Sequence, residues 1–181
     1  MKPDLWCPAV RSPFVVRALF VSSILFALTG CARHLPESRP HPLLSSAPKV
    51  IEEPTLKGEM ISFPKKGTVT VVDFWSTVCE PCLKMMPAME QLHEQHGEGL
   101  TVIGVAVDDN PGAVNERLKK LGIRYPNVLD DAGSSRGAYQ VDELPQTFIF
   151  DKTGKLRVVT KGGADGDVAV IRDAVEFLLA E

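Results

Sequence analysis

Two kinds of hydrophobic pattern alternate along the chain from about residue 55 to its end. Nearly continuous apolar runs rich in β-branched residues are typical of buried strands, whereas apolar residues that recur every three or four positions are typical of helices. The first pattern predicts strands at residues 68–75, 100–108, 125–131, 146–150 and 155–161, after a small hairpin at 55–63. The second predicts helices at residues 81–96, 111–121, 134–139 and 167–179. Strands that alternate with helices and end in a hairpin predict an α/β fold, with both faces of the sheet covered.

The first thirty residues follow a different pattern. Positive residues precede an uncharged, mostly apolar run at residues 18–28, which is shorter than the about 20 residues that a membrane-spanning helix needs. This arrangement is typical of a secretory signal, which we assign to residues 1–30 and exclude from the fold. The LTGC that ends at Cys31 resembles the bacterial lipobox, where a lipid is attached to the cysteine and cleavage occurs just before it. The alternative is an ordinary signal cut elsewhere, which leaves Cys31 a chance thiol.

The leader also predicts a location. We expect a domain in the bacterial cell envelope that faces the periplasm and is anchored to a membrane through a lipid on Cys31. Ala32 follows this cysteine in place of an aspartate, which by analogy with other lipoproteins favours the outer membrane over the inner one. Thiols outside the cytosol meet oxidising conditions, so a disulfide is expected to persist there.

A polar, proline-rich segment separates the leader from the first predicted element. Residues 31–54 contain five prolines, at positions 36, 40, 42, 48 and 54, and show no apolar periodicity. Such segments lean toward an extended conformation and act as semi-rigid spacers. We therefore expect a tether at residues 31–54 and a folded domain at residues 55–181, with an unstructured leader of no role as the alternative to the tether.

Charge and cysteine content narrow the possible functions. The 181 residues include 20 Lys and Arg against 23 Asp and Glu, for a net charge of −3. This charge is too mild to indicate a nucleic-acid partner, and no basic stripe with interleaved aromatic residues is present. Four cysteines do not make a disulfide-dense scaffold in a chain long enough to bury its own core. Each cysteine therefore needs its own explanation.

Two of the cysteines, Cys79 and Cys82, form a C-x-x-C motif between a predicted buried strand and a predicted helix. A sulfur at the start of a helix lies among unpaired backbone N–H groups and at the positive end of the helix dipole, which favours thiolate over thiol. The thiolate is the nucleophile in disulfide exchange. Pro81 suits the first helical turn, where its missing N–H costs little. We predict that Cys79 attacks a partner's disulfide and that Cys82, one turn on and more buried, resolves the mixed disulfide.

Asp73 is the one charged residue in the apolar strand that precedes this motif. Burial would raise the pKa of its carboxyl group, because an unpaired charge is disfavoured inside a protein. We predict that Asp73 exchanges a proton with Cys82 during the reaction. The alternatives are a surface aspartate on a strand edge and a buried aspartate that serves only packing.

These residues resemble a known family. The pattern D-F-W-x-x-x-C-x-P-C at residues 73–82, with Pro87 five positions after the second cysteine, is similar to thioredoxin. The leader and the segments VIGVAVDD, YPNVLDD and YQVDELPQTFIFDKTGKL, with a following glycine, resemble more closely the exported TlpA/ResA type. The resemblance covers about residues 55–180. It implies a thioredoxin fold with a central mixed sheet flanked by helices, an N-terminal β-hairpin and a βα insertion.

The resemblance also implies site residues and an activity. Cys79 and Cys82 match the redox pair, and Pro145 matches a cis-proline that exposes the backbone of Leu144 for strand-like pairing with a partner. Trp75 matches an aromatic residue beside the active site, and with Leu144 and Pro145 it is an expected contact for the substrate. The implied activity is thiol–disulfide exchange with envelope proteins, including those of cytochrome c maturation, fed by an upstream membrane electron donor. The redox-active disulfide is the implied cofactor, and no metal is expected.

Three residues set this chain apart from the family pattern, whereas the CEPC motif itself occurs in the ResA type. Val78 replaces a common tryptophan, Leu144 replaces Thr or Val, and Asp73 stands where many members have asparagine. Glu80 places a negative charge beside the thiolate and should partly oppose its stabilisation, which predicts a mild, reducing couple. The alternative for Glu80 is a solvated carboxylate that is stabilised by the helix dipole.

Other site classes fit the sequence less well. Cys79, Cys82, His93 and His96 have a spacing that is superficially similar to a zinc site, but they would lie along about 20 Å of one helical segment. A peroxiredoxin-type peroxidase would need a P-x-x-x-T-x-x-C setting, which is absent. A static disulfide that closes so small a loop would add little stability. Asp108 and Asp109 follow a predicted strand and could suggest a cation site, but we interpret them as solvated carboxylates.

Overall fold

The structure, a computed structural model, describes residues 34–108 and 110–181. The predicted signal segment and the predicted lipidation site Cys31 lie outside these residues. Within the part of the chain that is described, no helix is long and apolar enough to cross a membrane.

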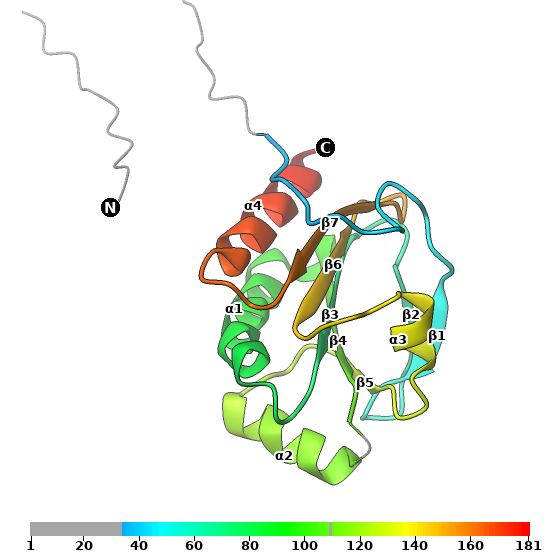
Figure 1. Ribbon diagram of the computed structural model, residues 1–181, viewed down its shortest axis with the longest axis vertical. Helices are drawn as coiled ribbons and strands as arrows, with labels where there is room; N and C mark the ends of the chain where they lie inside the picture. Colours follow the sequence, from blue (N-terminus) through cyan, green and yellow to red (C-terminus); the bar gives the residue numbers. More distant parts are fainter. Residues whose placement is uncertain (1–33, 109) are drawn as a thin grey trace, which may run out of the picture. The chain divides into compact units, whose positions relative to one another are not determined.

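A five-stranded sheet in the order β5-β4-β3-β6-β7 forms the centre of the domain (Figure 1). The central strand β3 pairs in parallel with β4 and antiparallel with β6. The outer strand β5 pairs in parallel with β4, and the outer strand β7 pairs antiparallel with β6. The strands are β3 (Val69–Trp75), β4 (Leu100–Ala106), β5 (Asn127–Leu129), β6 (Gln146–Phe150) and β7 (Leu156–Lys161). The mixed sheet with helices on its faces confirms the predicted fold class.

Two hydrophobic cores cover the two faces of this sheet. Successive side chains of a strand point to opposite faces, and in β3 Val71 and Trp75 enter one core while Val72 and Phe74 enter the other. The first core is closed by α1 (Glu80–His96), α2 (Pro111–Leu121) and α4 (Asp167–Ala180). The second is closed by the hairpin of β1 (Ile51–Pro54) and β2 (Met60–Phe63) and by α3 (Ser134–Ala138). Figure 1 shows α1 and α4 on one side of the sheet and α3 with the hairpin on the other.

Local residues set where the helices begin and end. Cys79 is the N-cap of α1, and Gly97 ends this helix before a short 3₁₀ helix, Gly97–Gly99. The side chain of Asn110 caps α2 by accepting hydrogen bonds from the next two N–H groups that lack a helical partner. Gly122, at a φ of 71°, ends α2 in the left-handed conformation that glycine adopts without strain. Proline near the helix start and glycine after its end thus account for the predicted bounds of α2.

The structure differs from the predicted boundary at residue 55. Strand β1 already begins at Ile51 and pairs with β2. Upstream, residues 38–46 run along β7, the edge strand of the sheet, whose outward N–H and C=O groups need partners. Four hydrogen bonds make this contact: Arg39 N–H to Val159 O at 2.9 Å, Val159 N–H to Ser38 Oγ at 2.8 Å, Ser45 N–H to Leu156 O at 2.9 Å, and Leu156 N–H to Ser46 O at 2.8 Å. Most of the segment expected to be a tether therefore belongs to the domain.

We predict that removing this segment destabilises the domain. A chain that begins at residue 47 loses the hydrogen bonds to β7 and the packing of Leu43 and Leu44 against the second core. Compared with a chain that begins at residue 34, its free energy of unfolding should fall by about 3 kcal/mol, from partial burial of two leucines and exposed edge hydrogen bonds. Urea unfolding of the two chains measures the difference, and equal stability would return the segment to the role of a tether.

Candidate active site

The two cysteines of the C-x-x-C motif lie at the start of α1, as the sequence predicts. They are joined in a disulfide, with an S–S distance of 2.02 Å and a Cα–Cα distance of 5.3 Å. Cys79 is half-buried, and its sulfur accepts a hydrogen bond from the N–H of Cys82 at 3.3 Å. Cys82 has no exposed surface. Because only the first sulfur is accessible, a partner can reach Cys79 and not Cys82.

Three segments that are distant in sequence meet beside this disulfide. The Leu144–Pro145 peptide bond is cis, as predicted, and Pro145 opens β6. Gly163, in the loop between β7 and α4, has a φ of 65° and lies against both prolines of the site. A Cβ atom there would come within 2.8 Å of Cβ of Pro81 and 3.0 Å of Cγ of Pro145. The close approach of α1, β6 and this loop therefore requires glycine.

Apolar side chains beside the first sulfur are covered to different degrees, and the exposed Glu80 adds a charge on the helix side. Val78 is 88% exposed and directly precedes Cys79, whereas Leu144 is half-buried and Pro145 is buried. Val78 is therefore not part of the core, and its side chain is open to contact from outside the domain. Val78, which the sequence singled out only as a departure from the family, thus becomes the most prominent residue of this surface.

Asp73 is buried in the central strand and faces the same core as Cys82. In the register of β3 and β6 it lies opposite Thr147, whose hydroxyl donates a hydrogen bond to its Oδ1 at 2.8 Å. Its Oδ2 is buried without a hydrogen-bond partner among the described residues. Burial raises the pKa of Asp73 to about 7, and the hydrogen bond from Thr147 lowers it by a smaller amount. The alternative of a surface aspartate on a strand edge is therefore wrong.

Trp75 lies in the same core as Cys82, but it does not reach the surface. Its side chain has no exposed surface, and its Nε1–H donates to Oδ1 of Asn127 at 3.0 Å. The amide of Asn127 in turn donates to the carbonyl of Tyr125 at 3.0 Å and fills the space in which a side chain at Gly104 would lie. The hydrogen bond that the indole donates to Asn127 of β5 holds it in the core. Because the side chain has no exposed surface, it cannot contact a partner, and the predicted role of Trp75 in substrate binding is wrong.

Glu80 lies in the first turn of α1 and points to solvent. Its carboxylate is 3.8 Å from the amine of Lys84, and both side chains are 73% exposed. A surface ion pair of this kind contributes little to stability. Glu80 thus adjoins Cys79 with an exposed carboxylate, and its effect on the neighbouring sulfur stays a prediction.

The residues considered for a metal site do not form a cluster. Cys79 and Cys82 are bonded to each other, and His93 packs its ring against Tyr125, with centroids 6.4 Å apart. In the described ranges, 34–108 and 110–181, no three or more His, Cys, Asp or Glu side chains gather where they could hold a metal ion.

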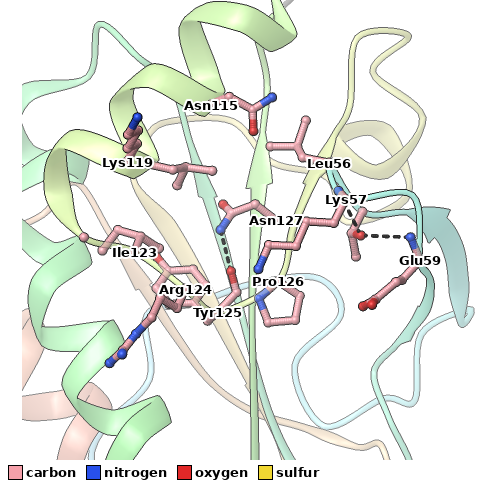
Figure 2. A pocket seen from close by; sticks show the side chains of 13 residues that line it. Leu56, Lys57, Glu59, Asn115, Lys119, Ile123, Arg124, Tyr125, Pro126 and Asn127 are labelled. Atoms are coloured by element: carbon pink, nitrogen blue, oxygen red, sulfur yellow. Dashed lines mark hydrogen bonds between the residues drawn. The ribbon is translucent and has the colours of Figure 1, made fainter.

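A cavity of about 600 Å³ lies elsewhere on the domain, between the turn of the β1–β2 hairpin, α2 and the start of β5 (Figure 2). Leu56, Ile123 and Pro126 are among its lining residues, and Figure 2 shows the amine of Lys57 extending across it. None of the predicted site residues lines this cavity. Its lining residue Asn127 accepts the hydrogen bond from Trp75, which ends the strand before the redox motif.

The fold and the site together define a class. A mixed sheet flanked by helices, a C-x-x-C motif at a helix start and an adjacent cis-proline make this a thioredoxin-like protein. The sequence profile of the AhpC/TSA family matches residues 45–159, and the chain belongs to this family.

Similar proteins agree with this assignment. The chain is 34% identical over 103 residues to thiol-disulfide oxidoreductase ResA of Bacillus thuringiensis, which covers 56% of this chain and 60% of the relative. It is 30% identical over 115 residues to sporulation thiol-disulfide oxidoreductase A of Bacillus subtilis, with 61% and 70% covered. A putative thiol:disulfide interchange protein DsbE from Chlorobium tepidum shares the fold, with a TM-score of 0.70, 23% identity, and 75% and 97% of the two chains covered.

The raised pKa of Asp73 predicts a pH-dependent gain of stability for Asp73→Asn. In the unfolded chain Asp73 ionises near 3.8, whereas in the folded protein it keeps its proton to about 7. Between these values only the unfolded state loses a proton, so the stability of the parent falls as pH rises through this window, and the loss is complete above the folded pKa. At about 1.4 kcal/mol per pKa unit, the variant should gain about 4 kcal/mol on the parent between pH 4 and pH 8.

Urea unfolding of the oxidised proteins at several pH values measures this gain. Thr147→Val serves as the matched control, because it removes the hydrogen bond that lowers the pKa of Asp73 and should move the ionisation to higher pH. A stability difference between Asp73→Asn and the parent that does not change with pH would show that Asp73 ionises normally.

Proposed function

We propose that this protein is a thiol–disulfide oxidoreductase that exchanges the Cys79–Cys82 disulfide with thiols or disulfides of other proteins. The observation that carries the proposal is the placement of the pair at the start of α1, with one sulfur accessible beneath an apolar rim and the other buried. A helix N-terminus favours a thiolate, and an exposed residue such as Val78 offers a contact for a protein partner.

In the reducing direction the reaction has two steps. The thiolate of Cys79 attacks one sulfur of the partner's disulfide, that S–S bond breaks, and the partner's other sulfur leaves as a thiolate that takes up a proton. The thiolate of Cys82 then attacks the Cys79 sulfur, which releases the second partner thiol and forms the Cys79–Cys82 bond. Two electrons and two protons pass to the partner. The oxidising direction is the same sequence in reverse.

Asp73 is proposed to accept the proton of Cys82 in the second step. It faces the same core as Cys82, and a pKa of about 7 lets the carboxyl group exist in both protonation states near neutral pH. Direct proton transfer requires hydrogen-bond distance or one bridging water, and the unpartnered Oδ2 is the oxygen available for it.

The relatives support an exchange activity. Both curated relatives are named thiol-disulfide oxidoreductases, but the chain spans 60% of the length of the ResA relative. A peroxidase is not favoured, because the P-x-x-x-T-x-x-C setting expected for it is absent from the sequence. A static structural disulfide is not favoured, because it would not need an accessible first sulfur.

The predicted signal segment supports a location in the cell envelope, and this location in turn calls for a source of electrons. We infer export, removal of residues 1–30 and a lipid on Cys31, which together would hold the domain in the cell envelope, with the outer membrane favoured. In an oxidising compartment a reductant needs a supply of electrons, so a membrane electron donor upstream is part of this proposal. Envelope proteins such as those of cytochrome c maturation are the proposed partners, and no nucleic acid is involved.

Trapping with Cys82→Ser tests the exchange reaction. The reduced variant should attack the disulfides of insulin and remain bound through Cys79, because the resolving thiol is missing. The matched variant Cys79→Ser should trap almost nothing, since Cys82 has no exposed surface. Gel analysis without reductant measures the adduct. Equal trapping by both variants would contradict the assigned roles, and failure of the parent to exchange with hydroxyethyl disulfide would contradict the function itself.

The charge of Glu80 predicts that the Cys79–Cys82 pair has a reducing potential. We expect a reduction potential closer to the about −270 mV of reducing thioredoxins than to the about −120 mV of strong oxidants. Glu80→Gln should make the potential less negative, because removing a negative charge beside Cys79 favours the thiolate form. The shift should be small, about twofold in the equilibrium constant, since an exposed charge is screened by solvent.

Equilibration with glutathione at pH 7 measures the potentials. Glu98→Gln, in the short 3₁₀ helix after α1, is the control and should leave the potential unchanged. A parent potential near that of strong oxidants would rule out the reducing couple, and an unchanged potential in Glu80→Gln would leave that side chain as a solvated carboxylate.

A further inference from the structure

The short loop between β3 and α1 is held by a carboxylate from the neighbouring strand. Strands β3 and β4 are parallel, and Trp75 is paired with Ala106, so the segments that follow the two strands leave the same end of the sheet. The N–H of Val107 donates to the carbonyl of Trp75 at 2.9 Å. One residue later, Asp108 comes to lie beside Thr77, two positions before the accessible cysteine.

Both oxygens of Asp108 are used on this one residue. The N–H of Thr77 donates to Oδ2 at 3.0 Å and to Oδ1 at 3.2 Å, and its hydroxyl donates to Oδ1 at 2.6 Å. Hydrogen bonds to a charged acceptor are about twice as strong as those between neutral groups. Asp108 is half-buried and is thus not the solvated strand-end carboxylate that the sequence suggested.

This anchor acts on the residue that carries the chemistry. Thr77 is separated from Cys79 only by the exposed Val78, and the N–H of Cys79 donates to the carbonyl of Ser76 at 3.2 Å. In the oxidised protein the disulfide itself ties Cys79 to α1. After reduction this covalent tie is lost, and the loop contacts have to keep the sulfur at the helix N-terminus.

We propose that Asp108 is a positioning residue for the redox reaction: by anchoring Thr77 it keeps Cys79 at the start of α1 in the reduced protein. The proposal rests on the proposed function, because positioning Cys79 matters only if the protein exchanges disulfides. The reduction potential, however, can be measured without any exchange partner. Weakening the Asp108–Thr77 contact destabilises the reduced form more than the oxidised form, because only in the oxidised form does the disulfide also hold Cys79 in place. The reduced form is then less favoured at equilibrium, and the reduction potential becomes more negative.

Thr77→Val tests this proposal without changing any charge. The variant keeps the shape of the side chain and loses the hydroxyl that donates to Asp108. We expect its equilibrium constant with glutathione to move about tenfold toward the disulfide, which corresponds to about 30 mV for a two-electron couple. Thr77→Ser, which keeps the hydroxyl, should restore the parent potential.

A second bond of the same kind provides the matched control. In the hairpin between β6 and β7, the hydroxyl of Thr153 donates to Oδ1 of Asp151 at 2.5 Å. Thr153→Val should lower the stability of the oxidised and reduced forms equally and leave the potential unchanged. A merely structural role for Thr77 predicts the same outcome for Thr77→Val, and that result would overturn the proposal.

A double-mutant cycle assigns the effect to the pair. Asp108→Ala removes a negative charge as well as the anchor, so its own potential combines two opposing changes. In that background Thr77→Val should cause no further shift, because its hydroxyl has lost its acceptor. A full shift there would mean that Thr77 acts without Asp108, and would overturn the proposal. The glutathione equilibrium needs no protein partner. A failure to exchange with proteins would therefore reject the proposed function, whereas the role of Asp108 would still be decided by the measured potentials.

Discussion

The burial of β3 on both faces is the constraint on which the rest of the structure depends. Its seven residues are all buried, and they are shared between two cores and between two neighbouring strands. A strand fixed in this way cannot shift its register without turning every side chain to the wrong core. It ends four residues before Cys79, so the position of the first sulfur is inherited from the most constrained element of the fold. The start of α1 is thus placed by packing rather than by the motif itself.

The same constraint explains why a carboxyl group in β3 is unusual. Every other residue of the strand is apolar or is threonine, and Asp73 has only the hydroxyl of Thr147 to offset the loss of water. Nearby, Tyr125 is also buried with its hydroxyl unpartnered among the described residues, and its pKa is raised well above 10 by burial and then by the charges of Asp73 and Glu90. A buried group that is only partly satisfied lowers stability, so a function that needs a proton acceptor at this depth gives a reason for its presence.

The sequence predicts those features of the structure that depend on residues close together in the chain, and it misses those that depend on distant residues. The bounds of α2 depend on Asn110, Pro111 and Gly122, which act within a turn, and the pattern of the buried strands is equally local, so these elements were predictable. The environment of Trp75 was not, because its partner Asn127 is 52 positions away. The anchoring of Thr77 by Asp108, 31 positions apart, was missed for the same reason, although two parallel buried strands could have indicated that their ends meet. The proline-rich segment was misjudged because its partner, the free edge of β7, exists only in the folded sheet.

The shape of the site also bears on what it can bind. A small substrate is usually held in a concave, mostly apolar pocket, and the cavity of about 600 Å³ beside α2 has this form but none of the redox residues. Cys79 instead follows Val78, which is 88% exposed and lines a groove of about 220 Å³ together with charged residues of α2. A protruding apolar residue gains by burial only when a partner brings a matching surface of its own. If the proposed exchange with proteins is right, specificity depends on the partner's surface around its cysteine, and the Asp108–Thr77 hydrogen bonds hold the loop that presents Val78 to that surface.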